Sequence, residues 1–341
     1  MKNYKYLLLL PFFFSCVKDK PNNPSEPEPS TISFKKVLVV NEGNFMSGNA
    51  SVSLYDPNVA SVVEDFYKSK NNTTLGDVAQ SISYFNSQYY IVVNNSGKIM
   101  VCDNDLKIKA SILSLNSPRY ILPIGNAKAY VSDLFSNFIH VLNLNTNQVT
   151  STIPCAGWTE KMVAIYSKAF ITNTKRNYTY VINTVNDTKS DSVFVGPNAG
   201  SILIDKNDKV WVLSAGNFTG GITPSLSRIN PTDNSIEKVY QFAQSDSPGN
   251  LCINKTKDTL YYLNNGIYRM SISDMTLPVT AFVLKGTRNY YGLGVNPGNY
   301  TLYASDALDY VSKSNIYIFD MNGTEKSFFK AGINANSFYF E

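Results

Sequence analysis

A short apolar run that ends on a small polar residue recurs seven times along the chain. Each run is followed by a polar loop and by a second run in which apolar and polar positions alternate. The intervals between the closing polar residues are 53, 39, 40, 41, 50 and 42 residues. Strand-like patterns with periods of roughly 40–45 residues are typical of propeller blades of four strands. The sequence therefore predicts an all-β, seven-bladed β-propeller. The seven runs are 36–41, 89–94, 128–133, 168–173, 209–214, 260–264 and 301–306.

The two ends of the repeat region predict how the ring closes. The run 36–41 fits the second strand of its blade, and 337–341 is a strand-like run that has no blade of its own. We therefore expect the C-terminal run to supply the innermost strand of the first blade, because this pairing removes two open sheet edges. The propeller domain then spans 36–341.

Turn sequences predict which loops share an end of the ring. Turns rich in Asn, Asp, Gly and Pro separate first from second strands and third from fourth strands. Because successive strands are antiparallel, the loops from second to third strand and the connections between blades lie together at the other end. We call it the loop end. Its loops contain aromatic residues away from strand positions: Phe45, Phe135, Tyr178, Phe218 and Tyr310.

Two interpretations of the loop end remain open. Asn and Asp end strands and shape turns, and aromatic rings pack between blades, so a structural role explains each residue taken singly. Taken together, the residues would form a shallow basin of flat rings surrounded by amide and guanidinium donors. Such a basin suits a large planar ligand with amide groups, or a sugar.

Composition and motifs argue against several function classes. Charged residues make up 16% of the chain and the formal net charge is +4, without a Lys/Arg stripe, which disfavours nucleic acid as a partner. The single histidine, His140, lies on an alternating strand, and no HExxH, GxSxG or phosphate-loop pattern occurs. Glu42, Asp133 and Asp306 could form a central carboxylate cluster like that of calcium-dependent propeller lactonases. We expect no enzyme activity, cofactor or metal.

The N-terminal segment predicts the compartment. Lys2 and Lys5 precede an apolar stretch, 6–14, that is too short to span a bilayer and suits a signal peptide. Ser15 and Cys16 follow, and this arrangement resembles a bacterial lipoprotein signal, which implies cleavage after residue 15 and lipidation of Cys16. An ordinary cleaved signal is the alternative. The proline-rich segment 16–35 is predicted to be an extended tether. Cys102, Cys155 and Cys252 show no spacing typical of a disulfide framework or a zinc site.

Several segments resemble the YncE-like surface propellers of Bacteroidetes: 39–45, 75–81, 90–99, 117–121, 291–297 and 303–311. Within that group the chain is similar to the BtuG-type lipoproteins, which bind cobalamin. The resemblance covers 36–341. It implies capture of cobalamin or a related corrinoid and transfer to a TonB-dependent outer-membrane transporter of the BtuB type, by a lipid-anchored protein of the outer membrane that faces the cell exterior.

The predicted ligand-binding residues all belong to the loop end. A glycan-binding or adhesion propeller is the second hypothesis, and a metal-dependent, lactonase-like hydrolase is the third. The candidate residues are Phe45, Asn94, Arg119, Tyr120, Asp133, Phe135, Trp158, Arg176, Tyr178, Phe218, Arg288, Tyr290, Tyr291, Asp306 and Tyr310.

Overall fold

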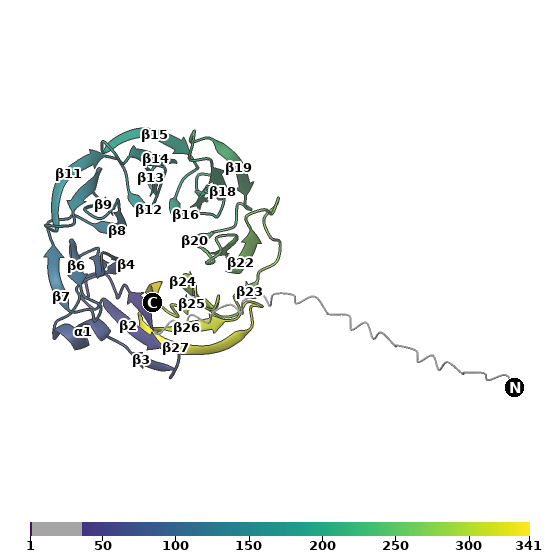
Figure 1. Ribbon diagram of the computed structural model, residues 1–341, viewed down its shortest axis with the longest axis horizontal. Helices are drawn as coiled ribbons and strands as arrows, with labels where there is room; N and C mark the ends of the chain where they lie inside the picture. The colour runs from purple at the N-terminus through teal and green to yellow at the C-terminus, as the bar shows by residue number, and fades with distance from the viewer. Residues whose placement is uncertain (2–35) are drawn as a thin grey trace. The chain divides into compact units, whose positions relative to one another are not determined.

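Seven four-stranded antiparallel sheets follow one another around a common centre, as Figure 1 shows. The computed structural model describes Met1 and residues 36–341. The chain divides into two units, Met1–Ile32 and Ser33–Glu341, and the propeller belongs to the second. Apart from Met1, the predicted signal segment and tether lie outside the described residues. Within the described part of the chain, no helix has the length and hydrophobicity needed to cross a membrane.

Each sheet is one blade, and its strands run in order from the innermost to the outermost. Blade 1 contains β28 (Ala335–Phe340), β1 (Val37–Asn41), β2 (Ser51–Asp56) and β3 (Ser61–Val63), and blade 2 contains β4 (Ala79–Phe85), β5 (Gln88–Val93), β6 (Lys98–Cys102) and β7 (Ile108–Ile112). Blade 3 contains β8 (Pro118–Pro123), β9 (Lys128–Asp133), β10 (Phe138–Asn143) and β11 (Gln148–Pro154), and blade 4 contains β12 (Thr159–Ile165), β13 (Lys168–Asn173), β14 (Tyr178–Asn183) and β15 (Thr188–Phe194).

The remaining three blades repeat this order. Blade 5 contains β16 (Ala199–Ile204), β17 (Val210–Ser214), β18 (Ser225–Ile229) and β19 (Ile236–Gln241). Blade 6 contains β20 (Gly249–Ile253), β21 (Thr259–Leu263), β22 (Gly266–Ser271) and the two-residue β23 (Val283–Leu284). Blade 7 contains β24 (Tyr290–Val295), β25 (Leu302–Asp306), β26 (Lys313–Phe319) and β27 (Glu325–Ile333). The all-β, seven-bladed prediction is confirmed, and each of the seven apolar runs forms the second strand of a blade.

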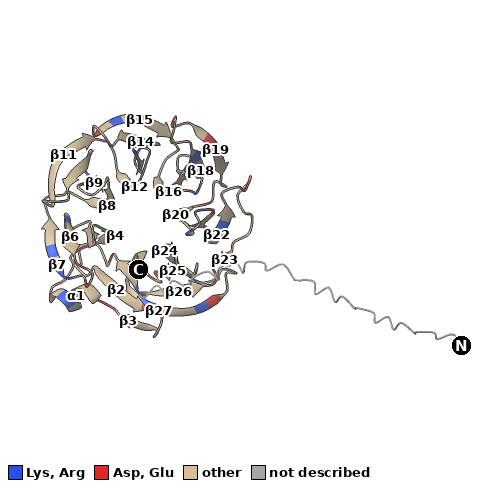
Figure 2. Ribbon diagram, viewed as in Figure 1, with Lys and Arg blue, Asp and Glu red and all other residues tan. Residues whose placement is uncertain are grey.

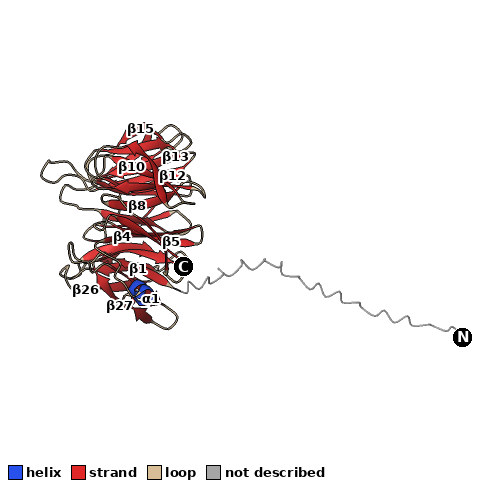
Figure 3. Ribbon diagram, turned by 90° about the vertical axis from the view of Figure 1, so that its left-hand side faces the viewer, coloured by secondary structure: helices blue, strands red, loops and turns tan. Residues whose placement is uncertain are grey.

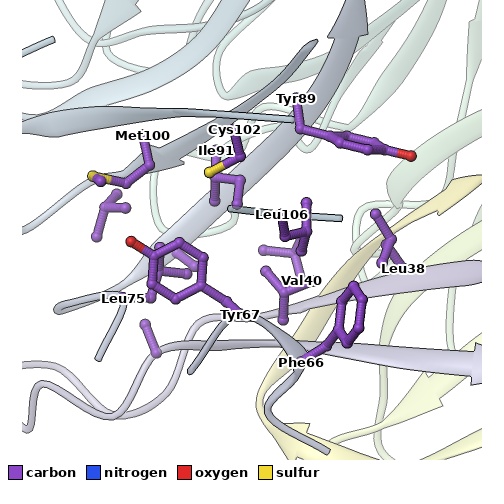
Figure 4. Close-up of a cluster of buried hydrophobic side chains, with 14 residues drawn as sticks. Leu38, Val40, Phe66, Tyr67, Leu75, Tyr89, Ile91, Met100, Cys102 and Leu106 are labelled. Atoms are coloured by element: carbon purple, nitrogen blue, oxygen red, sulfur yellow. The ribbon is translucent and has the colours of Figure 1, made fainter. Parts of the chain in front are cut away.

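The hydrophobic core consists of seven clusters, one between each pair of neighbouring blades. Second strands are buried over nearly their whole length because each lies between the two neighbouring blades, which cover its two faces. The cluster between blades 1 and 2, drawn in Figure 4, packs Leu38 and Val40 of β1 against Tyr89 and Ile91 of β5. Strands make up almost all of the regular structure, as Figure 3 shows.

The ring closes through the C-terminal strand, as predicted. β28 pairs antiparallel with β1, with Val37 opposite Phe340 and Val39 opposite Phe338. The same strand packs against β24 of blade 7, where the backbones approach closely. A Cβ atom on Gly292 would lie 2.7 Å from the carbonyl oxygen of Asn336, so this position admits glycine alone.

Two insertions account for the long intervals in the repeat. The six-residue helix α1 (Phe66–Asn71) follows β3, and the backbone N–H of Lys68 donates to the side chain of Asp65 at its N-terminus. The sequence pattern did not predict this helix. Its buried Phe66 and Tyr67 enter the cluster of Figure 4, so tertiary packing stabilises a segment too short to be helical alone. The other insertion is the loop 215–224 between β17 and β18.

Candidate functional site

All seven innermost strands begin with a β-bulge. In each blade the first residue pairs with the end of the second strand, and the pairing register then shifts. The bulge leaves one or two residues out of the ladder, and it redirects their side chains relative to a regular strand. In blade 2, for example, Ala79 and Ser81 pair with Val93 and Val92, and Gln80 is skipped.

The skipped residues line a cavity of about 280 Å³ at the loop end of the ring. Because every blade contributes its bulge at the same height, polar side chains from all seven blades meet there. Figure 2 shows the charged residues as separate segments around the ring, without a continuous basic stripe. The cavity is lined by Glu42, Gln80, Arg119, Tyr120, Glu160, Lys161, Thr174, Gly200, Ser201, Asn250, Tyr291, Asn336 and Ser337.

A chain of hydrogen bonds crosses the cavity wall from blade 7 to blade 4. Glu42 accepts hydrogen bonds from the Tyr291 hydroxyl at 2.6 Å and from Nδ2 of Asn336 at 2.7 Å. Nδ2 of Asn336 also donates to the carbonyl of Gln80 at 2.9 Å. Arg119 donates from Nη1 to Oε1 of Gln80, and its Nε lies 3.0 Å from both carboxylate oxygens of Glu160. The wall is therefore a connected polar network.

Burial dominates the electrostatics of this network. Loss of hydration raises the pKa of the Glu42 carboxyl, although Tyr291 and Asn336 donate to it. Burial likewise raises the pKa of Glu160 against the opposing effect of Arg119, and it lowers the pKa of the Lys161 ammonium. The Lys161 Nζ lies 5.9 Å from the centre of the Tyr120 ring. Charges are thus held in this cavity at an energetic cost.

Exposed aromatic rings lie on the loops around the cavity. Phe135 and Trp158 remain 61% and 39% exposed, although their rings meet edge to face at 6.0 Å. The Nζ of Lys175 lies 5.1 Å from the Trp158 ring. Tyr310 is exposed and contacts Tyr291 of the cavity wall at 5.9 Å between ring centres. Exposed rings therefore lie next to the polar cavity at this end of the propeller.

The structure divides the predicted site residues into three groups. Arg119, Tyr120 and Tyr291 line the central cavity. A second group is exposed at the loop end. Its members on loops are Phe45, Phe135, Trp158, Arg176, Phe218 and Tyr310. Tyr178 is also exposed, but the expectation that it lies away from strand positions was wrong, because it is the first residue of β14 and pairs with Phe194.

The third group is engaged in the framework of the loops. Asn94 donates to Oγ of Ser117 at 2.8 Å, and Asp133 and Asp306 are buried and accept backbone N–H groups of the adjacent turns. Arg288 pairs with Glu325 at 2.5 Å, and its guanidinium carbon lies 3.8 Å from the centre of the Tyr317 ring. Nη1 of Arg288 also donates to the hydroxyl of Tyr290 at 3.1 Å.

Five charged or amide residues of the cavity wall were missed in the sequence: Gln80, Glu160, Lys161, Asn250 and Asn336. A signal was present. Counting one skipped position per blade, namely 80, 119, 160, 200, 250, 291 and 336, gives intervals of 39, 41, 40, 50, 41 and 45 residues. Six of these seven positions carry a polar side chain one residue after the start of the innermost strand.

The hypothesis of a central cluster formed by Glu42, Asp133 and Asp306 finds no support in the geometry. In residues 36–341, no group of three His, Cys, Asp or Glu side chains is placed to hold a metal ion. His140 lies near Asp133, with 3.4 Å between Nε2 and Oδ2.

Burial raises the pKa of the free thiols Cys102 and Cys155 to about 12, which leaves them protonated at neutral pH.

Solved structures with this fold are numerous and distant in sequence. A quinonprotein alcohol dehydrogenase-like protein of Bacteroides thetaiotaomicron VPI-5482 matches with a TM-score of 0.72 and 14% identity, covering 90% of this chain and 78% of that one. The periplasmic gluconolactonase PpgL of Pseudomonas aeruginosa has a TM-score of 0.67 and 10% identity, with coverages of 89% and 98%. The dihydro-heme d1 dehydrogenase NirN, in complex with DHE, has a TM-score of 0.61 and 9% identity, with coverages of 93% and 77%. These likenesses concern the fold alone.

The family relationship rests on a match that extends over nearly the whole propeller. A search among curated proteins finds no match. The family described as "Domain of unknown function (DUF5074)" matches residues 35–340, and the chain therefore belongs to this family.

Proposed function

We propose that this protein binds cobalamin or a related corrinoid at the loop end of the propeller and does not convert it. The observation that carries the proposal is the arrangement of exposed aromatic rings on the loops around a polar centre. Trp158, Phe135 and Tyr310 offer flat apolar contacts at the periphery, and the cavity wall offers amide, hydroxyl and guanidinium groups. A corrinoid has the matching character, because its broad ring carries amide side chains at its edge.

Size decides how such a ligand would lie. A cavity of about 280 Å³ is at the lower limit of ligand pockets and is far too small for a corrin macrocycle. The macrocycle would therefore cover the mouth of the cavity and contact the loops of several blades. Loops held by buried side chains such as Asp133 form a preorganised surface, so little ordering entropy is lost on binding.

The proposed setting is the outer membrane. Cys16, which lies outside the described residues, would be lipidated, and the propeller would face the cell exterior and transfer its ligand to a TonB-dependent transporter of the BtuB type. Since acyl chains contribute about 0.8 kcal/mol per buried methylene, Cys16→Ala should release a folded protein from the membrane fraction. Retention of this variant in membranes would overturn the lipid anchor. Protease digestion of intact cells tests which side the propeller faces.

The ligand proposal is tested by titrating the purified full-length protein with cobalamin and with cobinamide. We expect saturable binding, seen both by calorimetry and as a change in the corrinoid absorption spectrum. The corrinoid recovered after incubation should be chemically unchanged, which tests binding against conversion. Absence of heat and of spectral change at micromolar protein would overturn the corrinoid proposal. A glycan array would then test the exposed rings as a carbohydrate-binding surface.

A further inference from the structure

The central cavity contains a cation without a polar partner. Among the described residues, the Nζ of Lys161 donates no hydrogen bond and forms no ion pair, and it lies 5.9 Å from the centre of the Tyr120 ring. The second cation of the wall, Arg119, is already neutralised by Glu160 at 3.0 Å. Lys161 is therefore the group in this cavity whose three donors remain available to a ligand.

Hydrogen-bond acceptors in the same wall are also underused. Oδ1 of Asn336 and Oγ of Ser337 are buried and have no hydrogen-bond partner. Both carboxylate oxygens of Glu160 accept a hydrogen bond from Nε of Arg119, and each oxygen keeps a further lone pair that can accept another hydrogen bond. Buried polar groups without partners are rare in folded proteins, and both of these residues belong to the cavity wall. The acceptors suit the hydroxyl groups of a ligand.

We propose that the central cavity binds a small hydroxylated carboxylate of the size of a sugar acid, with the carboxylate on Lys161 and the hydroxyls on the surrounding oxygens. A single ammonium that forms no direct ion pair matches a monoanion better than a phosphate dianion, because the carboxyl groups of Glu42 and Glu160 lie in the same wall and Glu160 already interacts with the charge of Lys161. The volume of about 280 Å³ limits the ligand to a small molecule. This site goes beyond the proposed corrinoid surface and does not depend on it.

Calorimetry of the full-length protein with D-glucuronate and D-glucose tests this site. The two sugars differ in the carboxylate at one carbon, so the comparison isolates the charge. We expect saturable glucuronate binding that is at least tenfold tighter than glucose binding. No glucuronate binding up to millimolar concentration, or equal binding of the two sugars, would overturn the proposal.

Variants locate the binding in the cavity. Lys161→Met removes the ammonium with little change in volume and should weaken glucuronate binding at least tenfold. Ser337→Ala removes one of the unpartnered oxygens of the cavity wall and should weaken glucuronate binding severalfold, which keeps the test decisive if Lys161→Met does not fold. The matched control is Lys175→Met, since Lys175 lies on the exposed Trp158 ring outside the cavity. Equal affinity for glucuronate in Lys161→Met and Lys175→Met, both shown to be folded by thermal melting, would contradict the assignment. Cobalamin binding is measured on the same variants, so a failure of either proposal is recognised separately.

Discussion

The Nε atom of Arg119 lies 3.0 Å from both carboxylate oxygens of Glu160, and this ion pair joins the innermost strands of blades 3 and 4. Both side chains are largely buried, at 19% and 8% exposure. Glu160→Gln would leave the guanidinium without a counter-charge in a poorly hydrated place. We expect this variant to lower the free energy of unfolding by about 3 kcal/mol, measured by urea denaturation.

The double variant Arg119→Met/Glu160→Gln is the control for this pair. Removing both charges avoids the buried unpaired ion, so the double variant should be more stable than Glu160→Gln alone. If the loss of unfolding free energy in the double variant equals the sum of the losses in Glu160→Gln and Arg119→Met, the two charges do not interact as the geometry indicates.

The buried carboxyl group of Glu42 should make the stability of the protein depend on pH. Burial raises the pKa of its carboxyl in the folded protein above the ordinary value of 4.5. The folded state then binds the proton more tightly than the unfolded state, so the contribution of Glu42 to stability falls as pH rises from 4.5 through the raised pKa. Glu42→Gln removes this titration. We expect its melting temperature to exceed that of the unaltered protein at pH 7, and the difference to shrink towards pH 4.

The control for this titration is Glu64→Gln. Glu64 is 51% exposed and pairs with Lys313 at 2.5 Å on the surface. Exposed pairs contribute little to stability, so this change should not raise the melting temperature at pH 7. An equal rise in both variants would show that the effect does not come from burial of Glu42.

The sequence predicts the blades because their second strands are buried on both faces and therefore read as continuous apolar runs. β5 and β9 show this burial over nearly their whole length. The bulges could not be read in the same way. A single polar residue such as Gln80, next to the start of an alternating strand, looks like one more solvent-facing position unless the seven innermost strands are aligned with one another. The helix α1 was missed because burial of Phe66 and Tyr67 stabilises it, and no local pattern announces that burial.

The candidate site was predicted in location and only partly in residues. Antiparallel pairing alone places the loops at one end, and the exposed Phe135, Tyr178 and Phe218 are found there. The polar residues that close the apolar runs have a structural role instead. Asp133 and Asp306 bind backbone N–H groups of their own turns, and a sequence pattern cannot separate this structural use from ligand binding.

Ring closure predicts a large effect of a small deletion. Removal of 337–341 takes away most of β28, which pairs with β1 and packs Phe338 and Phe340 against Tyr303 of blade 7. The deletion exposes the edge of β1 and opens the core between blades 7 and 1. We expect a sharp drop in the melting temperature, measured by circular dichroism. As a control, Ser337→Ala keeps the strand and removes a hydroxyl that has no hydrogen-bond partner, so this variant should melt close to the unaltered protein. An unchanged melt after the deletion would show that the pairing does not close the ring.

Trp158 and Arg288 should respond differently to replacement by alanine, because one is exposed at the loop end and the other is engaged between strands. Trp158→Ala removes a flat contact from the proposed corrinoid surface. Aromatic anchors commonly contribute about 2 kcal/mol, so cobalamin should bind about thirtyfold more weakly, with the melting temperature unchanged. Arg288→Ala breaks the contacts with Glu325 and Tyr317, and it should lower the melting temperature.

Tyr166→Ala is the matched control for Trp158. Its ring is 57% exposed in the turn between β12 and β13, at the end of the propeller opposite to the loops. Loss of this ring should leave cobalamin affinity unchanged, because a ligand at the loop end cannot reach it. Measuring cobalamin affinity by calorimetry for Trp158→Ala, Arg288→Ala and Tyr166→Ala then distinguishes binding at the loop end from nonspecific binding to exposed aromatic rings. Equal weakening by Trp158→Ala and Tyr166→Ala would argue against binding at the loop end.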